Sequence, residues 1–101
     1  MATIYFATGR YDPFPLPSGA DELLSALREG VGGDIQVVSL TGGRKMVVIE
    51  HGAALGFRCN ERATDVAESV LIPGDFIKGD AILCAPGELE RADAGESDAE
   101  N

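Results

Sequence analysis

One histidine and two cysteines are the residues of this chain that most readily ligate a metal or act as a nucleophile. His51, Cys59 and Cys84 are widely separated, whereas structural zinc sites use about four ligands, usually in closely spaced pairs. Cys59 follows Arg58, and a neighbouring cation is one feature of reactive cysteines. Cys84 falls in an apolar run typical of a core residue. The spacing therefore predicts no metal site, and a nucleophilic Cys59 is the weakest of the alternatives.

Two aspartates follow glycines in neighbouring turns, Asp75 after Gly74 and Asp80 after Gly79. Such a pair could act as an acid and a base, or hold a cation. Aspartate in a turn more often accepts hydrogen bonds from the backbone of its own loop. We expect this structural role for both residues.

The glycine-rich stretch 30–33 resembles a phosphate-binding loop in composition. A phosphate loop requires a strand, then glycines, then a helix whose first amides face the anion. Here the predicted order is helix, glycines, strand, so the glycines lie at the negative end of the helix dipole. The stretch therefore predicts a helix C-cap and a tight turn.

Five of the seven basic residues in positions 1–87 follow the first predicted helix. If the hairpin tip, the start of the second helix and the turn at Gly79 lie at one end of the fold, these side chains would form a pocket for an anion. Acidic residues are interleaved with them, so a solvated charged face is the alternative. The candidate ligand-binding residues are Arg44, Lys45, Arg58, Arg62 and Lys78.

The elements that would position these side chains begin with a predicted strand over 3–7, which is rich in β-branched and aromatic residues. Prolines at alternate positions in 11–17 exclude a helix and a central strand, so we expect an extended connector with its aromatic residues packed inward. Ser18 and Asp21, three residues later, resemble a capping box at the start of a helix. The apolar residues that follow are spaced to form one face of that helix. Gly30 is the predicted helix terminator.

Two β-rich runs, 35–40 and 45–51, are joined by a turn containing two glycines, which is typical of a hairpin. Both runs place apolar residues on both faces, so we expect a central pair of strands covered on each side. Asn60 is the predicted N-cap of a second amphipathic helix, and 81–85 is the last predicted strand. The sequence thus predicts an α+β fold with a small, mostly antiparallel sheet of about four strands and two amphipathic helices.

The net charge of −9 is divided unevenly along the 101 residues. Residues 88–101 contain six acidic residues and one basic residue, a net charge of −5, with almost no apolar anchor. Such a segment cannot offset its ordering entropy by burial, so we predict a single domain over 1–87 and a disordered acidic tail over 88–101. The −4 left on residues 1–87 disfavours direct binding of nucleic acid.

The start of the chain lacks the basic region of a secretory signal, and its apolar stretches are too short to span a bilayer. Two cysteines in such a chain are most simply free thiols in a reducing compartment. We therefore expect a cytoplasmic protein without membrane association and without a cofactor.

Five spaced motifs occur in order between residues 20 and 89: Leu27-x-x-x-Val31-Gly32-Gly33-x-Ile35, Met46-Val47-Val48, Gly56-Phe57-x-x-Asn60-x-x-Ala63-Thr64, Gly74-Asp75 and Gly79-Asp80-Ala81-x-Leu83-Cys84. Together they resemble domain-of-unknown-function family 3846, small proteins encoded largely by phages, plasmids and other mobile elements. The connector at 13–17 departs from the family's plainer N-terminal strand, and the acidic tail lies outside the match. The family has no assigned catalytic residue, so the resemblance implies none here.

These features predict a non-enzymatic binding protein of a mobile element, one that blocks a host process such as an antiviral defence by contacting a host protein. Strands that are apolar on both faces also suggest a homo-oligomer. One alternative is a small-molecule binder that captures a nucleotide signal with the five basic residues. Another is a nucleic-acid mimic whose carboxylates imitate phosphates.

Overall fold

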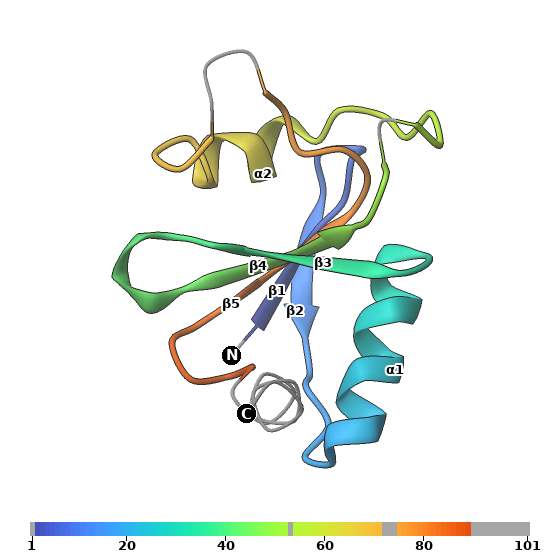
Figure 1. Ribbon diagram of the computed structural model, residues 1–101, viewed down its shortest axis with the longest axis vertical. Helices are drawn as coiled ribbons and strands as arrows, with labels where there is room; N and C mark the ends of the chain where they lie inside the picture. The colour runs from blue at the N-terminus through green and yellow to red at the C-terminus, as the bar shows by residue number, and fades with distance from the viewer. Residues whose placement is uncertain (1, 53, 72–74, 90–101) are drawn as a thin grey trace, which may run out of the picture.

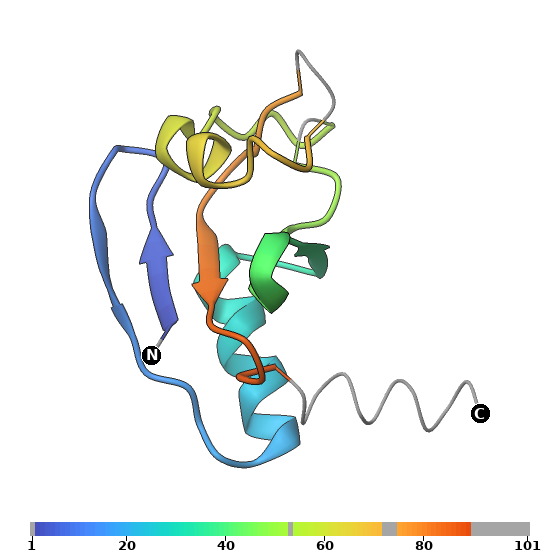
Figure 2. The same cartoon turned by 90° about the vertical axis from the view of Figure 1, so that its left-hand side faces the viewer.

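The described elements are β1 (Ala2–Tyr5), β2 (Tyr11–Phe14), α1 (Ala20–Val31), β3 (Ile35–Ser39), the 3-10 turn η1 (Thr41–Gly43), β4 (Lys45–Ile49), α2 (Glu61–Val66) and β5 (Ala81–Cys84). The five strands form one antiparallel sheet in the order β2-β1-β5-β4-β3 (Figure 1). The computed structural model describes residues 2–52, 54–71 and 75–89. One hairpin joins β1 to β2 and another joins β3 to β4, and β5 lies between the two hairpins (Figure 2). The predicted α+β class and antiparallel sheet are confirmed.

The predicted count of about four strands is wrong by one, because the expected connector contains β2. Pro13 is opposite Thr3 of β1 and is tolerated because β2 is an edge strand. The Phe6 amide donates to the Arg10 carbonyl, and hydrogen-bonded pairs alternate along an antiparallel ladder, so the Pro13 nitrogen faces away from β1. The proline therefore removes no ladder bond. Of its aromatic neighbours, Phe14 packs against the core and Tyr11 is exposed.

The predicted ends of the first helix are both shifted. Gly19 is the N-cap of α1 and makes no side-chain cap bond, so the capping box at Ser18 is wrong. Gly32, with φ of 90°, is the left-handed C-cap, and the amides of Gly32 and Gly33 donate to the Arg28 carbonyl. The glycine-rich stretch is therefore a helix terminator, as predicted, but Gly30 is not the terminating residue.

Gly30 lies within α1 and allows the helix to approach the sheet closely. A Cβ at this position would lie 2.9 Å from Cδ1 of Ile82 and 3.0 Å from the Phe14 ring. Its absence lets α1 place the buried side chains of Leu23, Leu27 and Val31 against the sheet. The close contact explains a glycine in a helix, where it costs about 1 kcal/mol relative to alanine.

The two helices lie on opposite sides of the sheet (Figure 1). Alternate residues of the strands face two apolar layers, one on the α1 side and one on the α2 side. In β4, Val47 and Ile49 belong to the α1 layer, whereas Met46 and Val48 belong to the α2 layer. This explains why the sequence of β4 is apolar on both faces. We expected both strands of this hairpin to be central in the sheet. This is correct for β4 and wrong for β3, which is an edge strand.

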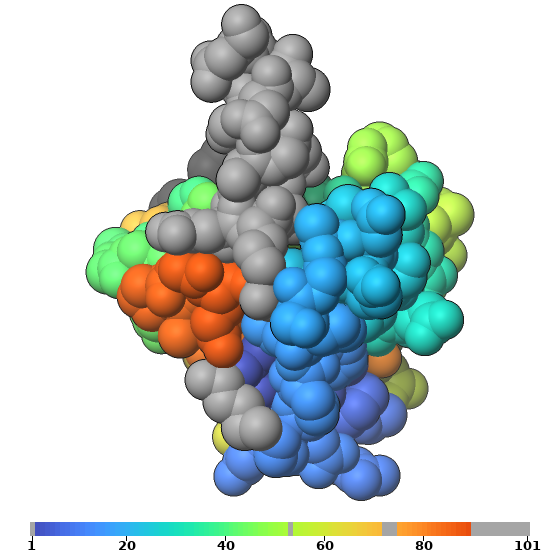
Figure 3. Space-filling view, turned by 90° about the horizontal axis from the view of Figure 1, so that it is seen from below, coloured from blue at the N-terminus to red at the C-terminus, as the bar shows by residue number. Residues whose placement is uncertain are grey.

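The folded part of the chain extends beyond the predicted boundary at residue 87. Leu89 is 3% exposed and packs in the α1 layer, and the Glu88 carboxylate accepts a hydrogen bond of 2.6 Å from the Ala85 amide. Figure 3 shows the segment before Leu89 in orange on the same face as β2 and α1. The rest of the predicted tail, 90–101, lies outside the described residues.

Candidate functional site

The end of the sheet where β1 and β4 finish and β5 begins is held by one buried polar side chain. Asn60 is 1% exposed, and its Oδ1 accepts a hydrogen bond of 3.0 Å from the Ala63 amide, which confirms the predicted helix cap. Its Nδ2 also donates to the carbonyls of Tyr5, at 2.8 Å, and Gly79, at 2.9 Å. Asn60 therefore links α2, the end of β1 and the turn before β5.

Two further side chains fix the loops around Asn60. The Thr64 hydroxyl donates to the Asn60 carbonyl and accepts a hydrogen bond of 2.9 Å from the Ile77 amide. The Asp80 carboxylate accepts a hydrogen bond of 2.9 Å from the Ala7 amide, 73 positions away. Asp80 is thus an acceptor for a backbone amide, but the predicted donor in its own turn is wrong, because the donor lies in a distant segment. Asp75 lies in a different cleft, beside Phe76.

An open pocket of about 640 Å³ lies beside this junction and contains two of the predicted ligand-binding residues. Arg58 and Arg62 line it together with Cys59 and residues 7–9. The Arg62 guanidinium carbon lies 5.1 Å from the centroid of the Tyr11 ring, which is the geometry of a cation–π contact. Glu61 and Asp65 line the same pocket, so its formal charges balance.

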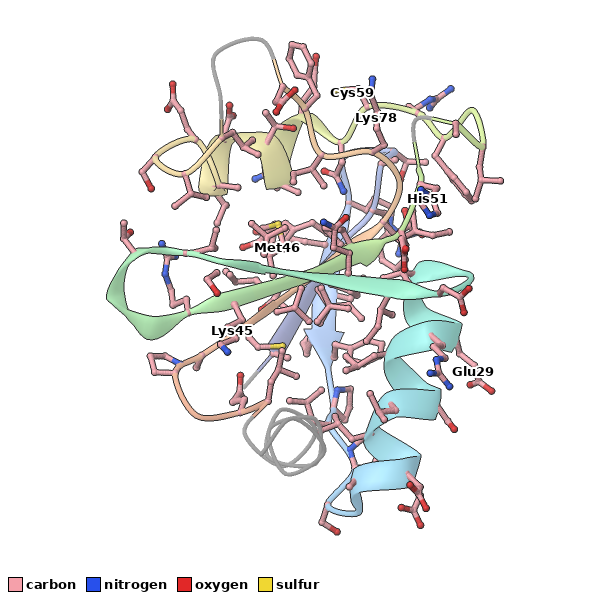
Figure 4. All side chains as sticks on the ribbon, in the orientation of Figure 1. Glu29, Lys45, Met46, His51, Cys59 and Lys78 are labelled. Atoms are coloured by element: carbon pink, nitrogen blue, oxygen red, sulfur yellow. The ribbon has the colours of Figure 1, made fainter. Side chains whose placement is uncertain are left out.

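The other three predicted residues lie elsewhere. Lys78 forms an isolated β-bridge with Cys59, and its Nζ lies 5.6 Å from the centroid of the Phe76 ring. Arg44 and Lys45 are at the start of β4, where Lys45 pairs with the last residue of β5, so they lie at the opposite end of the sheet. Figure 4 shows Lys45 far below Cys59 and Lys78. The structure brings Arg58 and Arg62 together and does not bring all five residues into one pocket.

The candidate metal and thiol residues are also separated. Cys59 is partly buried and pairs with Lys78, close to the start of β5. Cys84 is buried at the other end of β5. His51 is exposed, with Nε2 3.1 Å from the Glu50 carboxylate. Among residues 2–52, 54–71 and 75–89, no group of three or more histidine, cysteine or acidic side chains is arranged to hold a metal.

A patch of exposed apolar side chains at this end of the sheet was not predicted from the sequence. The loop patch consists of Leu55, Phe57 and Phe76, which are 64%, 39% and 55% exposed. Leu55 and Phe57 line a cleft of about 510 Å³, Phe76 lines another of about 410 Å³, and His51 lines both. A single-sequence pattern marks these positions as loop, and the exposure of each side chain depends on how the loops pack.

The chain matches no family model, no curated protein and no solved structure. The resemblance to domain-of-unknown-function family 3846 therefore stays a prediction. Within the described part of the chain, neither helix has the length and apolar character needed to cross a bilayer.

Proposed function

We propose that this chain is a non-enzymatic binding protein that docks a protein partner through the loop patch. The observation that supports this is the grouping of Leu55, Phe57 and Phe76 around one end of the sheet. Most exposed apolar residues on a protein surface are scattered singly, whereas grouped ones mark interaction sites. Aromatic side chains in such a group are the usual anchors of protein–protein binding.

The loop patch is held on a rigid base, which favours recognition of a defined partner. A Cβ on Gly79 would lie 3.5 Å from the Phe57 ring, and Asn60 bonds the Gly79 carbonyl. A Cβ on Gly52 would lie 3.0 Å from the Lys78 side chain, which in turn approaches the Phe76 ring. Preorganised anchors lose less conformational entropy when they bind.

The biological setting of the proposal comes from the sequence resemblance. We propose a protein of a phage or mobile element that acts in the host cytoplasm, where the partner is a host protein and the effect is inhibition. The nucleic-acid mimic remains an alternative, and five of the seventeen acidic residues that could support it lie in 90–101, outside the described residues.

Replacing Phe76 and Leu55 together with serine should abolish capture of the partner. The immobilised variant and the wild-type chain are exposed to the same host lysate, and the captured proteins are quantified by mass spectrometry. Loss of one anchor is expected to weaken binding about thirtyfold, since an anchor typically contributes about 2 kcal/mol, and loss of both should weaken it further.

Tyr11→Ser is the matched control, because Tyr11 is also 55% exposed but lies on β2, at the far edge of the sheet. The control should capture the same protein as the wild type. Equal capture by the wild type and by the Phe76/Leu55 variant would reject the loop patch as the docking surface.

The second candidate function is binding of an anionic small molecule, such as a nucleotide, in the pocket of Arg58 and Arg62. The two guanidinium groups share that pocket, and Tyr11 beside Arg62 offers an exposed ring on which a base could stack. Glu61 and Asp65 in the same pocket weigh against a highly charged ligand.

A thermal-shift screen with cyclic and ADP-ribose-type nucleotides tests this second function. A ligand at a hundredfold its Kd stabilises the folded chain by about 2.7 kcal/mol, which raises the Tm by about 10 °C or more. Arg58→Ala or Arg62→Ala should remove the shift, and Arg44→Ala, at the other end of the sheet, should retain it. A shift that persists in the Arg58 and Arg62 variants would place the ligand elsewhere.

A further inference from the structure

The two edges of the sheet differ in their capacity to accept another strand. At β2, residues 11 and 13 direct their backbone groups outward, and Pro13 has no N–H to offer. Asp12 adds a charge, paired with Arg10 at 3.6 Å. Proline and charge are the devices that protect an edge from pairing. The β2 edge is therefore blocked.

The β3 edge carries neither device. Its sequence, Ile35-Gln36-Val37-Val38-Ser39, has no charge and no proline, and three of the five residues are β-branched and apolar. In the described sheet, β3 has a neighbouring strand on one side alone, which is β4. Ile35 and Val37 are half-buried on the α1 side and Val38 on the α2 side, because the layers on both faces continue to this edge.

The register of β3 determines which backbone groups point outward. The Glu50 amide donates to the Asp34 carbonyl, and the Leu40 amide donates to the Arg44 carbonyl. Hydrogen-bonded pairs alternate in an antiparallel ladder, so the even-numbered residues 34–40 bond to β4. The N–H and C=O groups of Ile35, Val37 and Ser39 therefore face away from the sheet.

We infer that the β3 edge pairs antiparallel with β3 of a second copy of this chain, about a two-fold axis at Val37. This register places Val37 opposite Val37 and Ile35 opposite Ser39, so all outward backbone groups meet partners. An isologous interface requires such self-complementarity, and the spacing of three outward residues centred on Val37 supplies it. The result is a continuous ten-stranded sheet, twice the five strands of one chain.

Charges at the ends of β3 also match in this register. Asp34 of one copy lies opposite Leu40 of the other, and Leu40 is bonded to Arg44 across its own hairpin. Asp34 of one copy and Arg44 of the other are then separated by two strand spacings, about 10 Å between their Cα atoms. An arginine side chain can span this distance. The two-fold axis forms this pair twice. The apolar side chains of both copies meet on each face, Val37 with Val37 on the α1 side and Val38 with Gln36 on the α2 side.

The oligomeric state tests the inference directly. Sedimentation equilibrium of the full chain should give a concentration-dependent mass that rises toward twice 10.6 kDa. Asp34→Arg should raise the Kd of the dimer about tenfold, since it affects both symmetric pairs, and adding Arg44→Asp should restore it. A wild-type chain that stays at the monomer mass up to millimolar concentration would overturn the dimer.

Engineered cysteines test the register. In the inferred dimer, Val37→Cys places two thiols in a directly opposite pair with Cα atoms about 5.5 Å apart, so mild oxidation should give a covalent dimer. Ile35→Cys is the matched control on the same face of the same strand, because the two Ile35 positions lie about 13 Å apart. Equal cross-linking at both positions would overturn the two-fold at Val37. Circular dichroism of each reduced variant verifies that the chain is folded.

Discussion

Asn60→Ala is expected to lower the free energy of unfolding by at least about 3 kcal/mol. The side chain caps α2 and also satisfies the buried carbonyls of Tyr5 and Gly79. Loss of the cap costs about 1 kcal/mol, and each carbonyl left without its donor costs about 1–3 kcal/mol. Since a small domain is stable by about 5–15 kcal/mol, this one change removes a large part of the total. Urea unfolding followed by circular dichroism measures it.

Asn60→Asp separates the cap from the two carbonyl contacts. Aspartate is as good an N-cap as asparagine, but its second oxygen would face the Tyr5 and Gly79 carbonyls without a proton to donate. We expect this variant to be at least as unstable at pH 7 as Asn60→Ala. Near wild-type stability of the aspartate variant would mean that the cap alone accounts for the role of Asn60.

Leu27→Ala is expected to cost about 3 kcal/mol of stability. Leu27 is fully buried at the centre of the α1 stripe, in the layer that contains Val47 and Ile82. Shortening it removes burial and leaves a cavity that the close approach of α1 at Gly30 prevents the helix from filling. Thermal unfolding should show the Tm lowered by about 12 °C or more.

Leu24→Ala is the matched control for Leu27, because the chemical change is identical and Leu24, on the same helix, is partly buried. We expect a loss of about 1 kcal/mol, since less apolar area and a smaller cavity are involved. Equal losses for the two variants would contradict the placement of Leu27 at the centre of the layer.

The features that were predicted correctly are those with local causes. The apolar stripe of α1 repeats with the helical period, the β3–β4 hairpin is encoded by two β-rich runs around glycines, and the Asn60 cap contacts a residue three positions away. Each signal lies within a few residues of the structure that it specifies. The α+β class followed from these signals.

The features that were missed depend on contacts between distant segments. Pro13 correctly excludes a central strand, but the sequence does not reveal that β1 would leave an edge free beside it. The sequence predicts Gly30 as the helix terminator, because the contact that requires a glycine there comes from Ile82 of β5, 52 positions away. The same holds for the site. Asn60 donates a hydrogen bond to Tyr5, 55 positions away, and Arg44 and Arg58 lie at opposite ends of β4.

The position of β5 has a consequence for the order of folding. Each of the two hairpins has its own strands close in sequence, so either can close early at a small cost in loop entropy. β5 is the last of the described strands, yet it supplies the contact between the two hairpins in the middle of the sheet. A chain emerging from the ribosome therefore cannot join the two hairpins into one sheet until residues 81–84 are available. Until then the junction around Asn60, and with it both candidate binding surfaces, is not assembled.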